Sequence, residues 1–164
     1  MSNLSPLAWI EEAKTMLGKR EITENNAPFI KAMQKGLGWE WLGNVPWCGV
    51  FVAHCLKKAE LHYPTDGYRA KSYKTLVKKL DQPCVGCIVV FDREGGGHVG
   101  FIVGQTQDGR LMVLGGNQGN KVSIAPFSRT RKIEGYYWPS RSPHPDRYNL
   151  PIIHSNLSDS TNER

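Results

Sequence analysis

The stretch "NVPWCGVFVAHCLKKA", residues 44–59, combines a proline with a run of apolar side chains at helical spacing. Pro46 has no N–H to donate, which suits the start of a helix just after it. One apolar stripe then follows the 3.6-residue period, made of Cys48, Phe51, Val52, Cys55, Leu56 and Ala59. The pattern predicts a helix over residues 47–59 with Cys48 in its first turn.

The position of Cys48 has two interpretations. As a member of the apolar stripe it is a small core residue, which is the usual role of a lone buried cysteine. A helix N-terminus, however, presents unpaired N–H groups and positive potential, which stabilise a thiolate. The same N–H groups can hold an oxyanion. Cys55, two turns further on, lacks that field, so Cys48 is the candidate nucleophile and Cys55 a core residue.

The elements around this helix indicate the fold class. Two helices are predicted before it, over residues 5–18 and 27–35, and a short basic helix after it, over residues 70–80. Turn signals then separate five predicted strands, at residues 87–91, 98–105, 110–117, 121–127 and 133–139. Helices followed by a run of strands predict an α+β domain, with the N-terminal helices packed on an antiparallel β-meander of about five strands.

The composition changes near residue 140. From Ser140 onward the chain is rich in Ser, Pro and Asn and has few apolar residues. The 164 residues suit one compact domain with modest extensions. We therefore predict a catalytic domain over residues 1–139 and a polar tail over residues 140–164 that is extended or disordered.

The charge balance indicates an anionic partner. The formal net charge is +6 and the pI about 9.2, values that favour nucleic acid, anionic lipid or an acidic polymer such as a bacterial cell wall. No nucleic-acid-binding signature accompanies the basic residues, and no apolar run approaches the roughly 20 residues that span a bilayer. The opening "MSNLSPLAWIEEAKTML" contains two glutamates and no unbroken apolar region. We therefore expect no signal peptide, synthesis in the bacterial cytoplasm, and neither nucleic-acid binding nor membrane insertion.

A second pair of cysteines, Cys84 and Cys87, forms a CxxC motif. A thioredoxin-like motif would open a helix, whereas "CVGC" runs directly into the predicted strand "IVVF". A structural zinc site would need two further ligands at short spacing, which Cys48 and Cys55 do not provide. We favour a turn with partly buried thiols and expect no metal and no cofactor; a zinc-binding or redox-linked protein is the alternative interpretation.

A nucleophilic thiol needs a base that is near it in space. His98 starts a predicted strand directly after "REGGG", although a histidine in such a place is usually structural. The following Asp108-Gly109 predicts a hairpin, and a loop of two or four residues would pair Gly100 with Asn117. Asn117 would then be a diagonal neighbour of His98 on a glycine-rich face that another backbone can approach closely.

In that register Asn117 could hydrogen-bond the far ring nitrogen of His98 and fix its tautomer. The alternative makes Asn117 a turn residue of "GGNQGN", and the sequence favours neither. A bulge or a three-residue loop would change the register.

Three stretches, "PWCGVFVAHCL", "CIVVFDREGGGHVGFIVG" and "LMVLGGNQGNKVSIAPF", resemble the papain-like bacterial cell-wall hydrolases of the CHAP (cysteine, histidine-dependent amidohydrolase/peptidase) and NlpC-type families. The resemblance covers roughly residues 6–139 and is strongest to a small subgroup found in phage lysins and secreted antibacterial effectors. It implies Cys48 as nucleophile, His98 as general base and acid, and Asn117 as the residue that orients His98. Two departures are Cys87, where the family has an aspartate, and glycine where many members carry a glutamate near the histidine.

The resemblance also implies a function. We expect hydrolysis of a stem-peptide amide bond of peptidoglycan through a thioester, by an endopeptidase or an N-acetylmuramoyl-L-alanine amidase, with Trp47, Gly97 and Gln118 contributing to substrate binding. A leaderless lysin or effector would reach the periplasm or cell wall through phage lysis machinery or a secretion system, and an effector would have a cognate immunity protein. The alternatives are a non-catalytic wall-binding module and a papain-like deamidase or acyltransferase acting on a protein.

Overall fold

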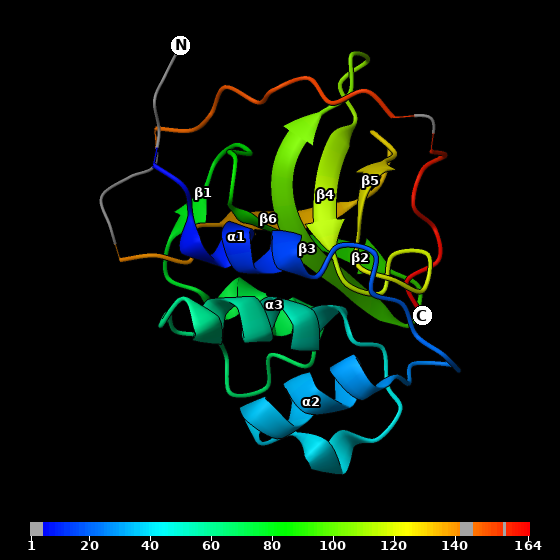
Figure 1. The fold of residues 1–164 in the computed structure, drawn as a ribbon. Coiled ribbons are helices and arrows are strands. Elements are labelled where there is room, and N and C mark those ends of the chain that lie inside the picture. The colour runs from blue at the N-terminus through cyan, green and yellow to red at the C-terminus, as the bar shows by residue number, and fades with distance from the viewer. Residues whose placement is uncertain (1–4, 142–145, 156) are drawn as a thin grey trace.

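The computed structural model describes residues 5–141, 146–155 and 157–164. The three helices predicted before residue 60 are confirmed, with ends shifted by a few residues (Figure 1). In chain order, the helical elements are α1 (Ala8–Thr15), α2 (Pro28–Leu37), the 3₁₀ helix η1 (Glu40–Leu42), α3 (Cys48–Lys58) and the 3₁₀ helix η2 (Ala70–Thr75). None of the described helices combines the length and the apolar character needed to cross a bilayer.

The strands form one antiparallel sheet in the order β1-β6-β2-β3-β4-β5. They are β1 (Lys79–Leu80), β2 (Ile88–Arg93), β3 (Gly96–Gln105), β4 (Leu111–Gly115), β5 (Ser123–Phe127) and β6 (Ile133–Tyr137). The α+β class is confirmed, and β2 to β5 form the predicted meander. The last strand departs from it, because β6 crosses back to pair with β2.

The predicted helix over residues 70–80 is wrong beyond Thr75. At Leu76 the backbone becomes extended, with φ −63° and ψ 137°, which ends η2. Lys79 and Leu80 then pair with Tyr137 and Tyr136 as the edge strand β1. A tertiary partner thus supplies the backbone hydrogen bonds that a helix would have made locally.

Helix α3 packs against β3 and β4. Its residues Val50, Phe51, Val52 and Ala53 are fully buried. A Cβ atom at Gly116, just after β4, would lie 2.7 Å from the Cβ of Phe51 and 2.8 Å from the Trp47 ring. The absence of a side chain at Gly116 therefore lets the start of α3 approach the sheet, and this places Cys48 beside β3.

The described part of residues 140–164 contains no helix or strand, yet it is hydrogen-bonded to the sheet. Gln105 of β3 forms a parallel bridge with Ile152, and Ser160 N–H donates to Pro126 O of β5 at 2.8 Å. In Figure 1 this segment, orange to red, passes around the outside of the sheet. The domain boundary at residue 139 stays a prediction, and residues 1–4, 142–145 and 156 lie outside the described residues.

Candidate active site

Cys48 is the first residue of α3 and is 3% exposed. The first turn of a helix leaves N–H groups without intrahelical partners, and these groups point toward a thiolate at that position. The backbone of Val99 in β3, against which α3 packs, also lowers the pKa of the Cys48 thiol. The local sequence thus places the thiol where α3 and β3 meet.

His98 lies near the start of β3 and is 0% exposed. Its ring stacks on Phe127 with centroids 5.4 Å apart and an interplanar angle of 17°, and lies 6.3 Å from the centroid of Phe91. Stacking against two aromatic side chains, from strands β5 and β2, therefore helps to fix the plane of the imidazole.

The structure brings Cys48 and His98 together. Burial by itself raises the pKa of the Cys48 thiol, but the charge of His98, with help from Val99 and Arg93, holds it below its ordinary value. Burial likewise lowers the pKa of His98, but Cys48, Glu163 and Gln118 raise it above its ordinary value. Both directions favour a thiolate next to an imidazolium.

The amide of Gln118 fixes the tautomer of His98. Its Nε2 atom donates to Val113 O at 3.0 Å and to Ser123 O at 2.9 Å, so both amide hydrogens have acceptors. Oε1 is then turned toward Nε2 of His98 at 2.9 Å, and because a carbonyl oxygen can only accept, Nε2 carries the hydrogen. The other ring nitrogen, Nδ1, is buried without a hydrogen-bond partner among the described residues, so it is left to exchange a proton with Cys48.

A glycine makes room for this amide. A Cβ atom at Gly115 would overlap Oε1 of Gln118 and would lie 3.5 Å from Nε2 of His98. The glycine-rich face predicted beside His98 is therefore present, but at Gly115 it admits a side chain and not a second backbone.

The predicted register between β3 and β4 is wrong. Phe101 pairs with Leu114 and Ile102 with Val113, and an irregularity follows before Gly104. Strand β4 ends at Gly115, so Gly100 does not pair with Asn117. The register already departs from the prediction at the turn, because Gln105 pairs with Leu111 across residues 106–110. The irregularity then shifts all later partners once more, and the hairpin signal carries no information about it.

Asn117 accordingly lies elsewhere. It is buried in a left-handed conformation, φ 59°, as suits a turn residue, and its Nδ2 atom donates to Glu163 O at 2.9 Å. Its Oδ1 atom has no hydrogen-bond partner among the described residues. The side-chain amide that contacts the ring of His98 belongs to the next residue, Gln118.

Sequence reasoning missed Glu163. Its Oε1 atom lies 3.9 Å from Nδ1 of His98, and both side chains are fully buried. Arg131 pairs with the carboxylate, with Nη2 2.6 Å from Oε1 and Nη1 3.3 Å from Oε2. The polar composition of residues 140–164 gave no signal that one of them would reach the histidine.

Cys48 opens onto a cleft of about 540 Å³. The lining residues come from η1 and the loop after it, η2 with the residues before it, and the β2–β3 turn, and they include Trp41, Leu42, Tyr68, Arg69, Lys71, Arg93 and Gly95 to Gly97. Trp41 is 68% exposed. Three of the lining side chains, Arg69, Lys71 and Arg93, are cationic, which suits an anionic substrate.

Of the residues predicted to bind substrate, Gly97 lines this cleft. Trp47 is fully buried, makes an edge contact with Phe29 at 5.3 Å between centroids, and is not among the lining residues. Gln118 is also buried, with its amide used by His98 and two carbonyl groups.

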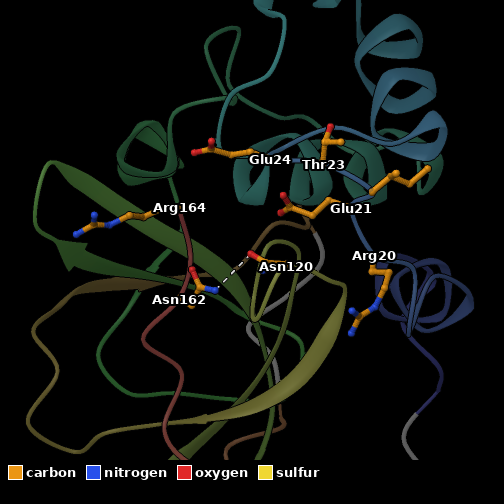
Figure 2. A pocket seen from close by; sticks show the side chains of 8 residues that line it. Arg20, Glu21, Thr23, Glu24, Asn120, Asn162 and Arg164 are labelled. Carbon is orange, nitrogen blue, oxygen red and sulfur yellow. Dashed lines mark hydrogen bonds between the residues drawn. The ribbon is translucent and has the colours of Figure 1, made fainter.

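A second cavity, of about 590 Å³, is lined by residues that carry both signs of charge. Figure 2 shows its lining residues Arg20, Glu21, Thr23, Glu24, Asn120, Asn162 and Arg164. None of them lines the Cys48 cleft. Of these two cavities, Cys48 therefore lines only the cleft of about 540 Å³.

Cys84 and Cys87 are free, buried thiols in the turn before β2. The Cys84 N–H donates to Cys87 Sγ at 3.5 Å, and a hydrogen bond from Cys87 lowers the pKa of Cys84. Within residues 5–141, 146–155 and 157–164, no group of three His, Cys, Asp or Glu side chains is placed to hold a metal ion.

The chain was compared with known proteins. The model of the CHAP domain family matches residues 39–117, a segment that contains Cys48, His98 and Asn117 and leaves out Gln118 and Glu163. Curated proteins and solved structures gave no significant match. CHAP domains have a papain-like α+β fold and are generally amidases or peptidases, which agrees with the sheet, the helix and the Cys–His pair described above. The match over residues 39–117 therefore supports the resemblance to the CHAP domain family.

Proposed function

We propose that this protein is a cysteine amidase or endopeptidase that hydrolyses an amide bond of the peptidoglycan stem peptide. The observation that carries the proposal is the placement of buried Cys48 and His98 where α3 packs on β3, with each group shifting the pKa of the other toward the ion pair. The CHAP domain supports a hydrolytic activity on peptidoglycan. The net charge of +6 supports association with an anionic wall.

In the proposed reaction the Cys48 thiolate attacks the amide carbonyl carbon. The carbonyl oxygen becomes an oxyanion, which backbone N–H groups at the start of α3, including that of Cys48, stabilise. The imidazolium of His98 gives its Nδ1 proton to the departing amine as the C–N bond breaks, which leaves a thioester. Neutral His98 then takes a proton from water, the resulting hydroxide attacks the thioester, and the thiolate leaves.

We assign the remaining residues by their contacts. Gln118 orients His98 by accepting its Nε2 hydrogen, the role that the sequence gave to Asn117. The stem peptide lies in the cleft beside Cys48, where Arg69 and Arg93 face its carboxylates and Gly97 borders the reacting bond. We propose that the protein acts in the periplasm or cell wall after delivery by a secretion system or phage lysis machinery, with an immunity protein in the first case.

The test is digestion of purified peptidoglycan by the wild type and by Cys48→Ala, with mass analysis of the soluble fragments. We expect new fragments from the wild type and none from Cys48→Ala. The fragment masses separate a muramoyl-L-alanine amidase from an endopeptidase. Cys55→Ala is the matched control, since Cys55 is buried in the same helix and the groups that shift its pKa do not include a histidine. This variant should retain cleavage.

Failure of the wild type to release new fragments would contradict the proposal. If the wild type and Cys48→Ala both bind the wall without cleaving it, the protein is a wall-binding module. If a protein substrate is modified in a Cys48-dependent manner while the wall stays intact, the protein is a deamidase or acyltransferase.

A further inference from the structure

A carboxylate from the segment of residues 157–164 lies beside the proposed catalytic histidine. Glu163 is 0% exposed, and its Oε1 atom is 3.9 Å from Nδ1 of His98. Burying an ionised carboxylate is costly unless the charge is paired and hydrogen-bonded. Arg131 supplies a bidentate pair, and the Ser160 hydroxyl donates to Oε2 at 3.1 Å. The buried charge is therefore built into the structure.

The charge state of Glu163 follows from these contacts. Burial raises its pKa, but the hydrogen bond from Arg131 and the charge of His98 bring it below its ordinary value. Glu163 is thus ionised at neutral pH. The effect is reciprocal, since the carboxylate contributes to the raised pKa of His98.

The segment is anchored at Glu163 and at the residue before it. Gly119 N–H donates to Asn162 O at 3.0 Å, and Asn162 Nδ2 donates to Asn120 Oδ1 at 3.3 Å (Figure 2). Asn117 Nδ2 donates to the carbonyl oxygen of Glu163 itself. The loop between β4 and β5 therefore holds the backbone that carries the carboxylate, and Asn117 contributes to this positioning.

The segment does not obstruct the cleft. The residues that line the cavity at Cys48 come from the chain between Trp41 and Gly97, and none belongs to the segment of residues 157–164. Glu163 therefore reaches His98 without covering the described route to the thiol. This placement suits a group that acts on the histidine and not one that competes with substrate.

We propose that Glu163 is a positioning residue that stabilises the imidazolium form of His98, so that the segment of residues 157–164 is a working part of the active site. The proposal deepens the proposed function and rests on it for the reaction involved. The ring of His98 is then surrounded by Cys48 from α3, Gln118 from the β4–β5 loop and Glu163 from this segment.

Two further charges act through these groups. Arg131 packs over the rings of Phe91 and Phe127 and offsets part of the carboxylate's field, while Arg93 acts on Cys48. With both cations in place, the charge of Glu163 still contributes to the raised pKa of His98, and its Oε1 atom lies 3.9 Å from Nδ1. The net field of Glu163 at the ring is therefore attractive for a proton.

The test compares Glu163→Gln with Asp159→Asn. Asp159 is a matched control, since it lies in the same segment and pairs with Arg110 instead of His98. The first measurement is the pH dependence of Cys48 alkylation by iodoacetamide, in which the thiolate displaces iodide, followed by mass analysis of the Cys48 peptide. The second is the pH dependence of kcat/KM on peptidoglycan fragments, with the melting temperature as a check on folding.

For Glu163→Gln we expect slower alkylation at neutral pH and a loss of kcat/KM of about 10- to 100-fold, the range typical when an outer partner of a functional histidine is removed. The alkaline limb of kcat/KM should move to lower pH, because the imidazolium loses its proton more readily without the carboxylate. Asp159→Asn should retain wild-type behaviour in both measurements.

An unshifted pH profile in a folded Glu163→Gln protein would overturn the proposal, even if its activity or melting temperature falls. If the glutamine amide opposite Arg131 prevents folding, Glu163→Ala removes the charge without placing a donor there. The pH profiles of alkylation and of kcat/KM are then measured on Glu163→Ala, and unshifted profiles would again overturn the proposal. If the wild type does not cleave peptidoglycan but the alkylation profile still shifts in Glu163→Gln, the proposed function fails and the role of Glu163 stands.

Discussion

At the scale of single residues, the proposed chemistry depends on which groups lie beside each ring nitrogen of His98. Gln118 accepts from Nε2, while Cys48 and Glu163 lie on the side of Nδ1. Because the amide of Gln118 is itself fixed by two carbonyl groups, the tautomer does not depend on the substrate. The base is therefore prepared before the substrate binds.

Replacement of Gln118 tests this tautomer control. Gln118→Leu keeps the approximate shape but removes the acceptor, which allows the hydrogen to move to Nδ1 and leaves Cys48 without a base. We expect kcat/KM to fall by about 100-fold or more, since loss of tautomer control in catalytic triads is costlier still. Steady-state kinetics on wall fragments measure the effect; Gln118→Glu, which keeps an acceptor, should retain more activity than Gln118→Leu, and the reverse order would contradict the assignment.

The two directions of pKa shift predict the pH dependence of the wild type. The thiolate of Cys48 is present above a lowered pKa, and the imidazolium of His98 persists below a raised pKa. The reaction needs both forms, so kcat/KM should follow a bell-shaped curve with a broad plateau between the two limbs. A curve that rises steadily through the alkaline range would argue against an imidazolium acid.

The residue-scale predictions from sequence succeeded where the signal was local. A helix start and a strand start carry short-range patterns, and these led to Cys48 and His98 as neighbours. Gln118 was assigned to the substrate, because the register of a hairpin depends on an irregularity that its turn residues do not encode. Glu163 reaches the site only through tertiary packing of a polar segment.

At the scale of elements, the site depends on how closely α3 approaches the sheet. Gly116 faces Phe51 and Trp47, and Gly49 faces the backbone of Gly67 and Tyr68, so α3 has a glycine contact on two sides. A side chain at either glycine would shift the first turn of α3, and Cys48 with it, from its present position. The geometry of the Cys–His pair is therefore a packing property of the helix.

Gly116→Ala tests this packing. The added methyl would lie 2.7 Å from the Cβ of Phe51, so we expect a loss of about 1–3 kcal/mol in the free energy of unfolding and a weaker Cys48–His98 contact. Gly36→Ala is the control, since nothing lies within 4 Å of its Cβ position near the end of α2. It should stabilise the protein by about 0.5–1 kcal/mol. Urea unfolding measures both, and equal effects would contradict the argument.

Sequence predicted the elements better than their partners. The periods of the three α-helices and of β2 to β5 are local features, and all of these elements are present. The return of β6 to β2 and its extension by β1 join segments far apart in the chain, with no turn signal between them. For the same reason the residues after Thr75 were predicted as helix, although their hydrogen bonds are made with β6.

At the scale of the whole molecule, a basic protein is proposed to act on an anionic polymer. The net charge is +6, and Arg69, Lys71 and Arg93 are among the residues that line the cleft at Cys48. Lys71 is paired with Asp92 at 2.6 Å, which leaves the two arginines as the stronger candidates for substrate carboxylates. Long-range attraction would bring the protein to the wall, and the cleft would select the stem peptide.

Salt should separate these two steps. Raising the salt concentration from about 50 mM to about 500 mM shortens the screening length to a few ångströms, so binding to intact wall should weaken markedly. Hydrolysis of a small soluble stem-peptide fragment should fall less, because contacts inside the cleft are less screened. Sedimentation of the protein with purified wall and fragment kinetics measure the two; an equal salt response would count against long-range attraction.

The docking of residues 157–164 has a practical consequence for anyone who handles this protein. Whatever is fused after Arg164 is attached one residue away from the carboxylate beside His98. An affinity tag, fluorophore or surface tether at that end would pull on the segment that holds the carboxylate beside His98. A tag placed after Arg164 would lower turnover without touching the cleft.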